Sequence, residues 1–133
     1  MRILVTGGSG YIGSHATHLF AMAGHEIANF DREPAVQELG QFFQGEPEDA
    51  DSIFHAMGRF KPEAVVHLAG NSNMADSFEN PHHYLLGVLR SAANILDSMA
   101  SHACHRIVFS SSCSVYGDIR NATEESPKNP LSP

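Results

Sequence analysis

The feature that most constrains this chain is a short apolar strand that runs directly into three evenly spaced glycines. The segment Arg2–Thr6 is rich in β-branched and aliphatic residues, and Gly7, Gly10 and Gly13 follow it. Residues 11–23 then carry apolar side chains at helical spacing. A strand, a glycine turn and a helix in this order predict the first unit of a parallel α/β sheet.

The rest of the chain continues this alternation. Four more strands are expected at 26–30 (ending at Asp31), 41–44, 64–68 and 106–111, and two more helices at 49–58 and 81–101. Alternating strands and helices joined by right-handed crossovers form a parallel sheet with helices on both faces. We therefore expect one domain over residues 1–133, a doubly wound Rossmann-type fold with about five strands in the order 3-2-1-4-5.

Composition excludes several classes of function. The chain of 133 residues has a formal net charge of -7 and only 8 Lys and Arg, which do not cluster, so we expect no nucleic-acid partner. The apolar start is too short for a signal peptide or a membrane span. Cys104 and Cys113 lack a CxxC spacing and are typical of free thiols in the cytoplasm. The 9 histidines lack the spacing of a zinc site, so we expect no metal.

The residues that follow the strand ends are candidates for a common binding crevice. Residues 7–13, Asp31, residues 68–70 and residues 110–112 each come at or directly after the end of an expected strand. In an open α/β sheet ligands bind at the carboxyl ends of the strands, where these segments meet. The glycines allow a phosphate to approach the backbone, and the following helix offers free N–H groups. The pattern predicts a dinucleotide site, and the alternative is a glycine turn that holds no ligand.

Asp31 is the candidate that selects the cofactor. It lies at the end of the second strand, near the offset expected of an acid that accepts from ribose hydroxyls. Its carboxylate would repel a 2′-phosphate, which favours NAD over NADP, although the adjacent Arg32 weakens that preference. The alternative is a surface acid in a turn.

The helix expected at 81–101 carries apolar residues on more than one side, among them Leu85, Leu86 and Ile95. A helix that is apolar on several sides is buried on several sides. One side packs on the sheet, and the other needs a later helix or another subunit. We expect a homo-oligomer, such as a dimer, that associates through this helix.

Several motifs together resemble the extended short-chain dehydrogenase/reductase family, and within it the NAD-dependent sugar-nucleotide 4-epimerases, which are isomerases. The motifs are Val5-Thr6-Gly7-Gly8-Ser9-Gly10-Tyr11-Ile12-Gly13-Ser14-His15, His67-Leu68-Ala69-Gly70, Ser110-Ser111-Ser112, Val115-Tyr116-Gly117 and Asn129-Pro130-Leu131-Ser132-Pro133. The resemblance implies that NAD contacts Gly7, Gly10, Tyr11, Ile12, Gly13, Asp31, Leu68, Ala69, Gly70, Ser110 and Ser111. It also implies that Ser112 is catalytic and hydrogen-bonds O4 of the hexose.

The resemblance places the catalytic Tyr-x-x-x-Lys of the family immediately after Pro133. Tyr11, Tyr84 and Tyr116 are the only tyrosines of the chain, and none begins such a motif. We therefore expect the chain to be the amino-terminal, cofactor-binding portion of a family member, without the substrate lobe and inactive alone.

Three departures from the family pattern support a rival hypothesis. Glu46 in Gly45-Glu46-Pro47 stands where the family usually has Asp, Ser72 replaces a frequent lysine, and Val88 replaces an active-site asparagine. The rival is a non-catalytic NAD-binding module or truncated paralogue. Dehydration is disfavoured, because Cys113 and Ser114 stand where related dehydratases carry an Asp-Glu pair.

Overall fold

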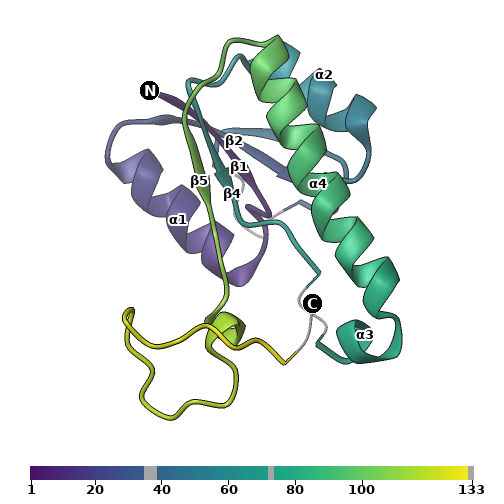
Figure 1. Ribbon diagram of the computed structural model, residues 1–133. Helices are drawn as coiled ribbons and strands as arrows, with labels where there is room; N and C mark the ends of the chain where they lie inside the picture. The colour runs from purple at the N-terminus through teal and green to yellow at the C-terminus, as the bar shows by residue number, and fades with distance from the viewer. Residues whose placement is uncertain (35–38, 72–73, 132–133) are drawn as a thin grey trace.

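The computed structural model describes residues 1–34, 39–71 and 74–131. All five strands are parallel and form one sheet in the order β3-β2-β1-β4-β5, which confirms the predicted fold class (Figure 1). The elements in chain order are β1 (Arg2–Thr6), α1 (Tyr11–Met22), β2 (Glu26–Asp31), β3 (Gln41–Gln44), α2 (Ala50–Phe60), β4 (Ala64–His67), α3 (Met74–Glu79), α4 (Pro81–Ser101), β5 (Ile107–Phe109) and the 3₁₀ turn η1 (Cys113–Tyr116).

The sheet has a hydrophobic cluster on each face. Because side chains alternate along a strand, Leu4 of β1 points to one face while Ile3 and Val5 point to the other. The larger cluster joins the sheet to α2 and α4, and the smaller one joins it to α1. Figure 1 shows the same layering, with α1 on the opposite side of the sheet from α2 and α4. The central strand β1 is therefore buried on both faces and on both edges.

Local signals fix where the helices end. Gly24 has φ of 81°, and its N–H donates to the Ala21 carbonyl at 3.0 Å, which stops α1 as the sequence predicts. The α2 helix starts at the side-chain cap Asp49, whose carboxylate accepts from the Asp51 N–H at 3.2 Å. That helix passes Gly58, where the prediction ends it, because Phe60 is buried in the core.

The last strand is shorter than predicted. The sequence indicates 106–111, but only Ile107–Phe109 pairs with β4. The neighbour sets this limit: β4 ends at His67, so past Phe109 the described chain makes one further backbone hydrogen bond to β4, from the Ser110 N–H to the His67 carbonyl at 3.1 Å. The sequence does not predict the short elements α3 and η1, because six and four residues are too few to show a period.

Within the described part of the chain, no helix combines the length and the apolar character that crossing a lipid bilayer requires.

Candidate functional site

The glycine turn between β1 and α1 is held by contacts that exclude side chains. Gly7 has φ of 74°, and a Cβ there would lie 2.7 Å from the Ala69 amide nitrogen. A Cβ on Gly13 would overlap the Gly7 carbonyl oxygen. Gly10 differs, because a Cβ there would meet only the Gly7 carbonyl, at 3.3 Å. The fold itself therefore needs glycine at positions 7 and 13, while the space above Gly10 is open.

The N-terminus of α1 opens from this turn. Gly10 is its N-cap and supplies no side-chain hydrogen bond, and the first turn holds no acidic residue. The first amides of a helix have no acceptor within it, and the helix dipole is positive there. Tyr11 and Ile12 are 84% and 63% exposed, so this end of α1 faces open space. It has the geometry and the charge to receive a phosphate group.

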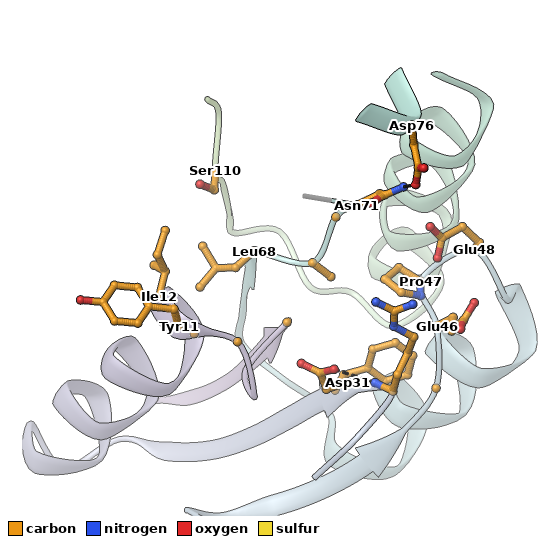
Figure 2. Close-up of a pocket in the computed structure, with 18 residues that line it drawn as sticks. Tyr11, Ile12, Asp31, Glu46, Pro47, Glu48, Leu68, Asn71, Asp76 and Ser110 are labelled. Carbon is orange, nitrogen blue, oxygen red and sulfur yellow. Dashed lines mark hydrogen bonds between the residues drawn. The ribbon is translucent and has the colours of Figure 1, made fainter. Parts of the chain in front are cut away.

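Asp31 ends β2 beside the turn. Its two carboxylate oxygens accept from the Ser9 N–H at 3.0 Å and from the Arg32 N–H at 2.7 Å. These two bonds fix the carboxylate at the rim of the crevice, and each oxygen retains acceptor capacity for a hydroxyl. Figure 2 shows Asp31 facing the cavity from the end of its strand.

The turn after β4 forms the opposite wall. The Leu68 N–H donates to the Thr6 carbonyl at 3.0 Å, and the Ala69 N–H donates to the Thr6 hydroxyl at 3.4 Å. A Cβ added to Gly70 would meet nothing within 4 Å. The wall is thus anchored to β1 at its base and open at its tip.

The serine segment after β5 continues the same edge. The Ser112 hydroxyl caps η1 by accepting from the Ser114 N–H at 3.1 Å, and Ser110 Oγ donates to the Ser111 carbonyl at 3.3 Å. Ser110, Ser111 and Ser112 are all exposed. Their hydroxyls can hydrogen-bond a ligand, but few contacts hold the segment in place.

Two adjoining cavities lie along this edge, with volumes of ≈ 810 Å³ and ≈ 580 Å³. The first is bounded by Gly7, Gly10, Tyr11, Ile12, Gly13 and Asp31, the second by Ser111 and Ser112, and both by Leu68, Ala69, Gly70 and Ser110. Figure 2 shows the first cavity between α1 and the ends of the strands. The structure therefore brings every residue of the predicted site to one continuous crevice.

Two of the three departures also lie on this crevice. Glu46 lines the first cavity, and Val88 of α4 lines the second. The Pro47 carbonyl beside Glu46 accepts from Asn94 Nδ2 at 2.9 Å, which ties this wall to α4. Ser72 lies outside the described residues.

Sequence reasoning missed a polar wall between the two cavities. Tyr84 Oη donates to the Asn71 carbonyl at 2.6 Å, and Asn71 Nδ2 donates to Asp76 Oδ2 at 2.9 Å, as Figure 2 shows for the latter pair. Glu48 lines both cavities. No signal in the sequence marks these residues, because the wall joins the turn after β4 to α3 and α4, whose relative positions only the fold sets.

His67, at the end of β4, is buried beneath the second cavity. Burial lowers its pKa below the ordinary 6.5, because the low-dielectric surroundings disfavour the charged ring. Among the residues that the structure describes, no three His, Cys, Asp or Glu side chains cluster as ligands of a metal ion would.

Comparison with known proteins connects this crevice to a family. The model of the NAD dependent epimerase/dehydratase family matches residues 3–133. UDP-glucose 4-epimerase of Corynebacterium glutamicum is 34% identical over 98% of this chain and 41% of its own length. The chain therefore spans about two fifths of that relative.

Solved structures show the same likeness. UDP-glucose 4-epimerase of Thermus thermophilus in complex with NAD matches with a TM-score of 0.88 and 30% identity, over 99% of this chain and 45% of that one. The Bifidobacterium longum enzyme in complex with NAD+ and UDP matches with a TM-score of 0.86 and 25% identity, over 97% of this chain and 43% of that one. The family model and these relatives show that the chain belongs to the NAD dependent epimerase/dehydratase family.

Proposed function

We propose that this chain is the NAD-binding portion of a sugar-nucleotide 4-epimerase of the UDP-glucose/UDP-galactose type. The observation that carries the proposal is the convergence of the glycine turn, Asp31, the turn 68–70 and the serines 110–112 on one crevice. The relatives named UDP-glucose 4-epimerase, two of them solved with NAD, support it.

The residues present fit the dinucleotide. The open space above Gly10 and the uncapped N-terminus of α1 suit the pyrophosphate. The Asp31 carboxylate suits the adenosine ribose and disfavours a 2′-phosphate, so the proposed cofactor is NAD. Residues 68–70, with Ser110 and Ser111, would guide the nicotinamide half toward the second cavity. When bound, NAD supplies the hydride acceptor for oxidation at C4 of the hexose.

The chain's own contribution to that chemistry is Ser112. Ser112 lines the second cavity, where its hydroxyl would donate to O4 of the hexose and hold that oxygen in place. Epimerisation also needs a base to remove the O4 proton, and the sequence holds no Tyr-x-x-x-Lys. We therefore propose that the 133-residue chain binds NAD and is inactive as an epimerase.

A non-catalytic NAD-binding module is the second candidate. Val88 favours it, because an aliphatic side chain lines the second cavity where the family pattern has an active-site asparagine. Glu46, which lines the first cavity, is the other departure from the family pattern among the described residues.

Calorimetry with NAD tests both candidates at once. Saturable binding together with no turnover of UDP-galactose is the expected result for this chain. Absence of binding at millimolar NAD would reject both, and turnover of UDP-galactose would refute the proposed inactivity.

A chimera separates the two candidates. The chain is joined to the remaining residues of the Corynebacterium glutamicum relative and assayed for interconversion of UDP-galactose and UDP-glucose. Epimerase activity, raised further by Val88→Asn, supports the catalytic hypothesis. A folded chimera that binds NAD and shows no turnover with or without Val88→Asn favours the module.

We further propose that the chain self-associates through α4 in the cytoplasm. Leu85, Leu86, Leu89 and Leu96 of that helix are each more than 40% exposed. An apolar strip of this kind normally finds a partner. Light scattering should report an assembly larger than one chain that Leu89→Glu dissociates, and a monomer at high concentration would contradict the proposal.

The proposed cytoplasmic location is supported by the exposed thiol of Cys113, which suits a reducing compartment.

A further inference from the structure

Three buried polar side chains beneath the crevice form a connected row that the proposed function does not use. The Thr6 hydroxyl lies 2.6 Å from His67 Nδ1, and the Ser91 hydroxyl lies 3.4 Å from His67 Nε2. All three residues are nearly inaccessible, with Thr6 at 0% and His67 and Ser91 at 4% exposure. The row runs from the base of the glycine turn on β1, through β4, to the α4 wall of the second cavity.

Counting donors and acceptors favours one direction for the hydrogen bonds of this row. The Thr6 oxygen accepts from the Ala69 N–H at 3.4 Å. Among the described residues, His67 Nδ1 is the acceptor within reach of the Thr6 hydroxyl proton, so satisfying that buried proton requires Nδ1 to accept it. Burial favours the neutral ring, in which an accepting Nδ1 requires the proton on Nε2. In that tautomer the Nε2–H group would donate to Ser91 Oγ.

The last member of the row is left with a proton to give. In that tautomer Ser91 Oγ accepts from His67, its hydrogen-bond partner within the described chain. Ser91 lines the second cavity, so water or a ligand in that cavity can accept its hydroxyl proton. A hydroxyl whose oxygen already accepts is polarised toward donating, because hydrogen bonds in a chain reinforce one another.

We propose that His67 is a positioning residue, held as the Nε2–H tautomer by Thr6, and that it orients the Ser91 hydroxyl to donate to an acceptor oxygen on the nicotinamide half of the bound dinucleotide. This assignment rests on the proposed function for the identity of the ligand. The hydrogen bonds between Thr6, His67 and Ser91 are contacts within the chain and do not depend on the ligand.

The same row links the two cavities. At one end the Ala69 amide, which is part of the wall shared by both cavities, donates to Thr6. At the other end Ser91 lines only the second cavity. Loss of the serine hydroxyl should therefore affect ligands that reach the second cavity and spare those confined to the first.

The tautomer can be measured on the unaltered chain by long-range ¹H–¹⁵N correlation spectra of the His67 ring under mildly alkaline conditions. The expected result is a protonated Nε2 and an unprotonated Nδ1. The tautomer should persist in Ser91→Ala, because Thr6 sets it. A protonated Nδ1 in the unaltered chain would overturn the inference.

The ligand is tested by calorimetry on Ser91→Ala with NAD and with AMP, which lacks the nicotinamide half. We expect the affinity for NAD to fall about fivefold and that for AMP to stay unchanged. The matched control is Ser98→Ala, which removes another buried serine hydroxyl from the same helix and should leave both affinities unchanged.

Two outcomes would count against the ligand assignment. Equal NAD affinity in Ser91→Ala and the unaltered chain would overturn it while leaving the proposed function intact. Failure of the unaltered chain to bind NAD would overturn the ligand assignment together with the proposed function. The tautomer measurement would still test the hydrogen bonds that join Thr6, His67 and Ser91.

Discussion

The two ends of the crevice are built differently. At the glycine end, β1 and β2 are buried along most of their length, and the turn between β1 and α1 leaves no room for side chains at Gly7 and Gly13. At the serine end, all three residues of β5 are exposed, and the segment that follows is held by the bond from the Ser110 N–H to His67 and by a few turn hydrogen bonds. Substitutions of Gly7 and Gly13 at the first end should therefore damage the fold, and those at the second end should change binding alone.

The largest expected effect is that of Gly13→Ala. Its new methyl group would overlap the Gly7 carbonyl, so we expect a loss of about 3 kcal/mol in the free energy of unfolding, measured with urea. Gly70→Ala is the matched control at the tip of the wall, because a Cβ there meets nothing within 4 Å. Equal stability of Gly13→Ala and Gly70→Ala would contradict the view that the glycine turn is more tightly packed than the tip of the wall.

Asp31→Asn probes the binding role at the glycine end. The amide keeps an oxygen for the Ser9 N–H but loses the charge that strengthens a ribose hydrogen bond. We expect NAD affinity to fall about tenfold and the preference for NAD over NADP to shrink, as measured by calorimetry. An unchanged ratio of the two affinities would show that Asp31 does not face the ribose.

Ser98→Ala tests whether the buried hydroxyl of Ser98 on α4 makes any stabilising hydrogen bond. The Ser98 hydroxyl has no hydrogen-bond partner among the described residues and is 2% exposed. Removing a buried, unpaired hydroxyl should raise the free energy of unfolding by about 1 kcal/mol, measured by urea denaturation. A loss of stability would mean that the hydroxyl is satisfied in solution.

The smallest effect concerns pH. Because the pKa of His67 is lowered in the folded chain, the unfolded chain binds more protons as the pH falls below 6.5. The contribution of His67 to stability is therefore complete above that pH and declines below it. Urea denaturation from mildly alkaline to mildly acidic pH should show a decline that is weaker in His67→Gln, whose side chain does not titrate. Parallel profiles for the two chains would contradict a titrating buried ring.

How far the sequence predicts the structure also differs between the two ends. The glycine end is predictable, because a buried strand, a tight turn and a helix each leave a local pattern in residues 2–23. The end of β5 is not, because its length depends on where β4 stops, and the last pair of that ladder joins His67 to Phe109, which are distant in the sequence. The contact of His67 with Ser91 is hidden for the same reason, since it joins β4 to α4.

The missed wall between the cavities has the same cause. Tyr84 and Asn71 meet because α4 lies against the turn after β4, and nothing local in either segment encodes that contact. Helix ends are predictable where a glycine stops the helix, as at Gly24, and less so where burial of Phe60 extends α2 past Gly58.

The register of the sheet has a consequence for how the chain folds as it is synthesised. The central strand β1 pairs with β2 through Arg2↔Glu26, but its other edge waits for β4, beginning at Ile3↔Ala64. Roughly half of the chain must therefore leave the ribosome before β1 has both neighbours, and contacts between distant segments form slowly. Until then one backbone edge of β1 is unpaired and the apolar side chains of Leu4 and Val5 are uncovered on its two faces, so the nascent chain can aggregate through this strand.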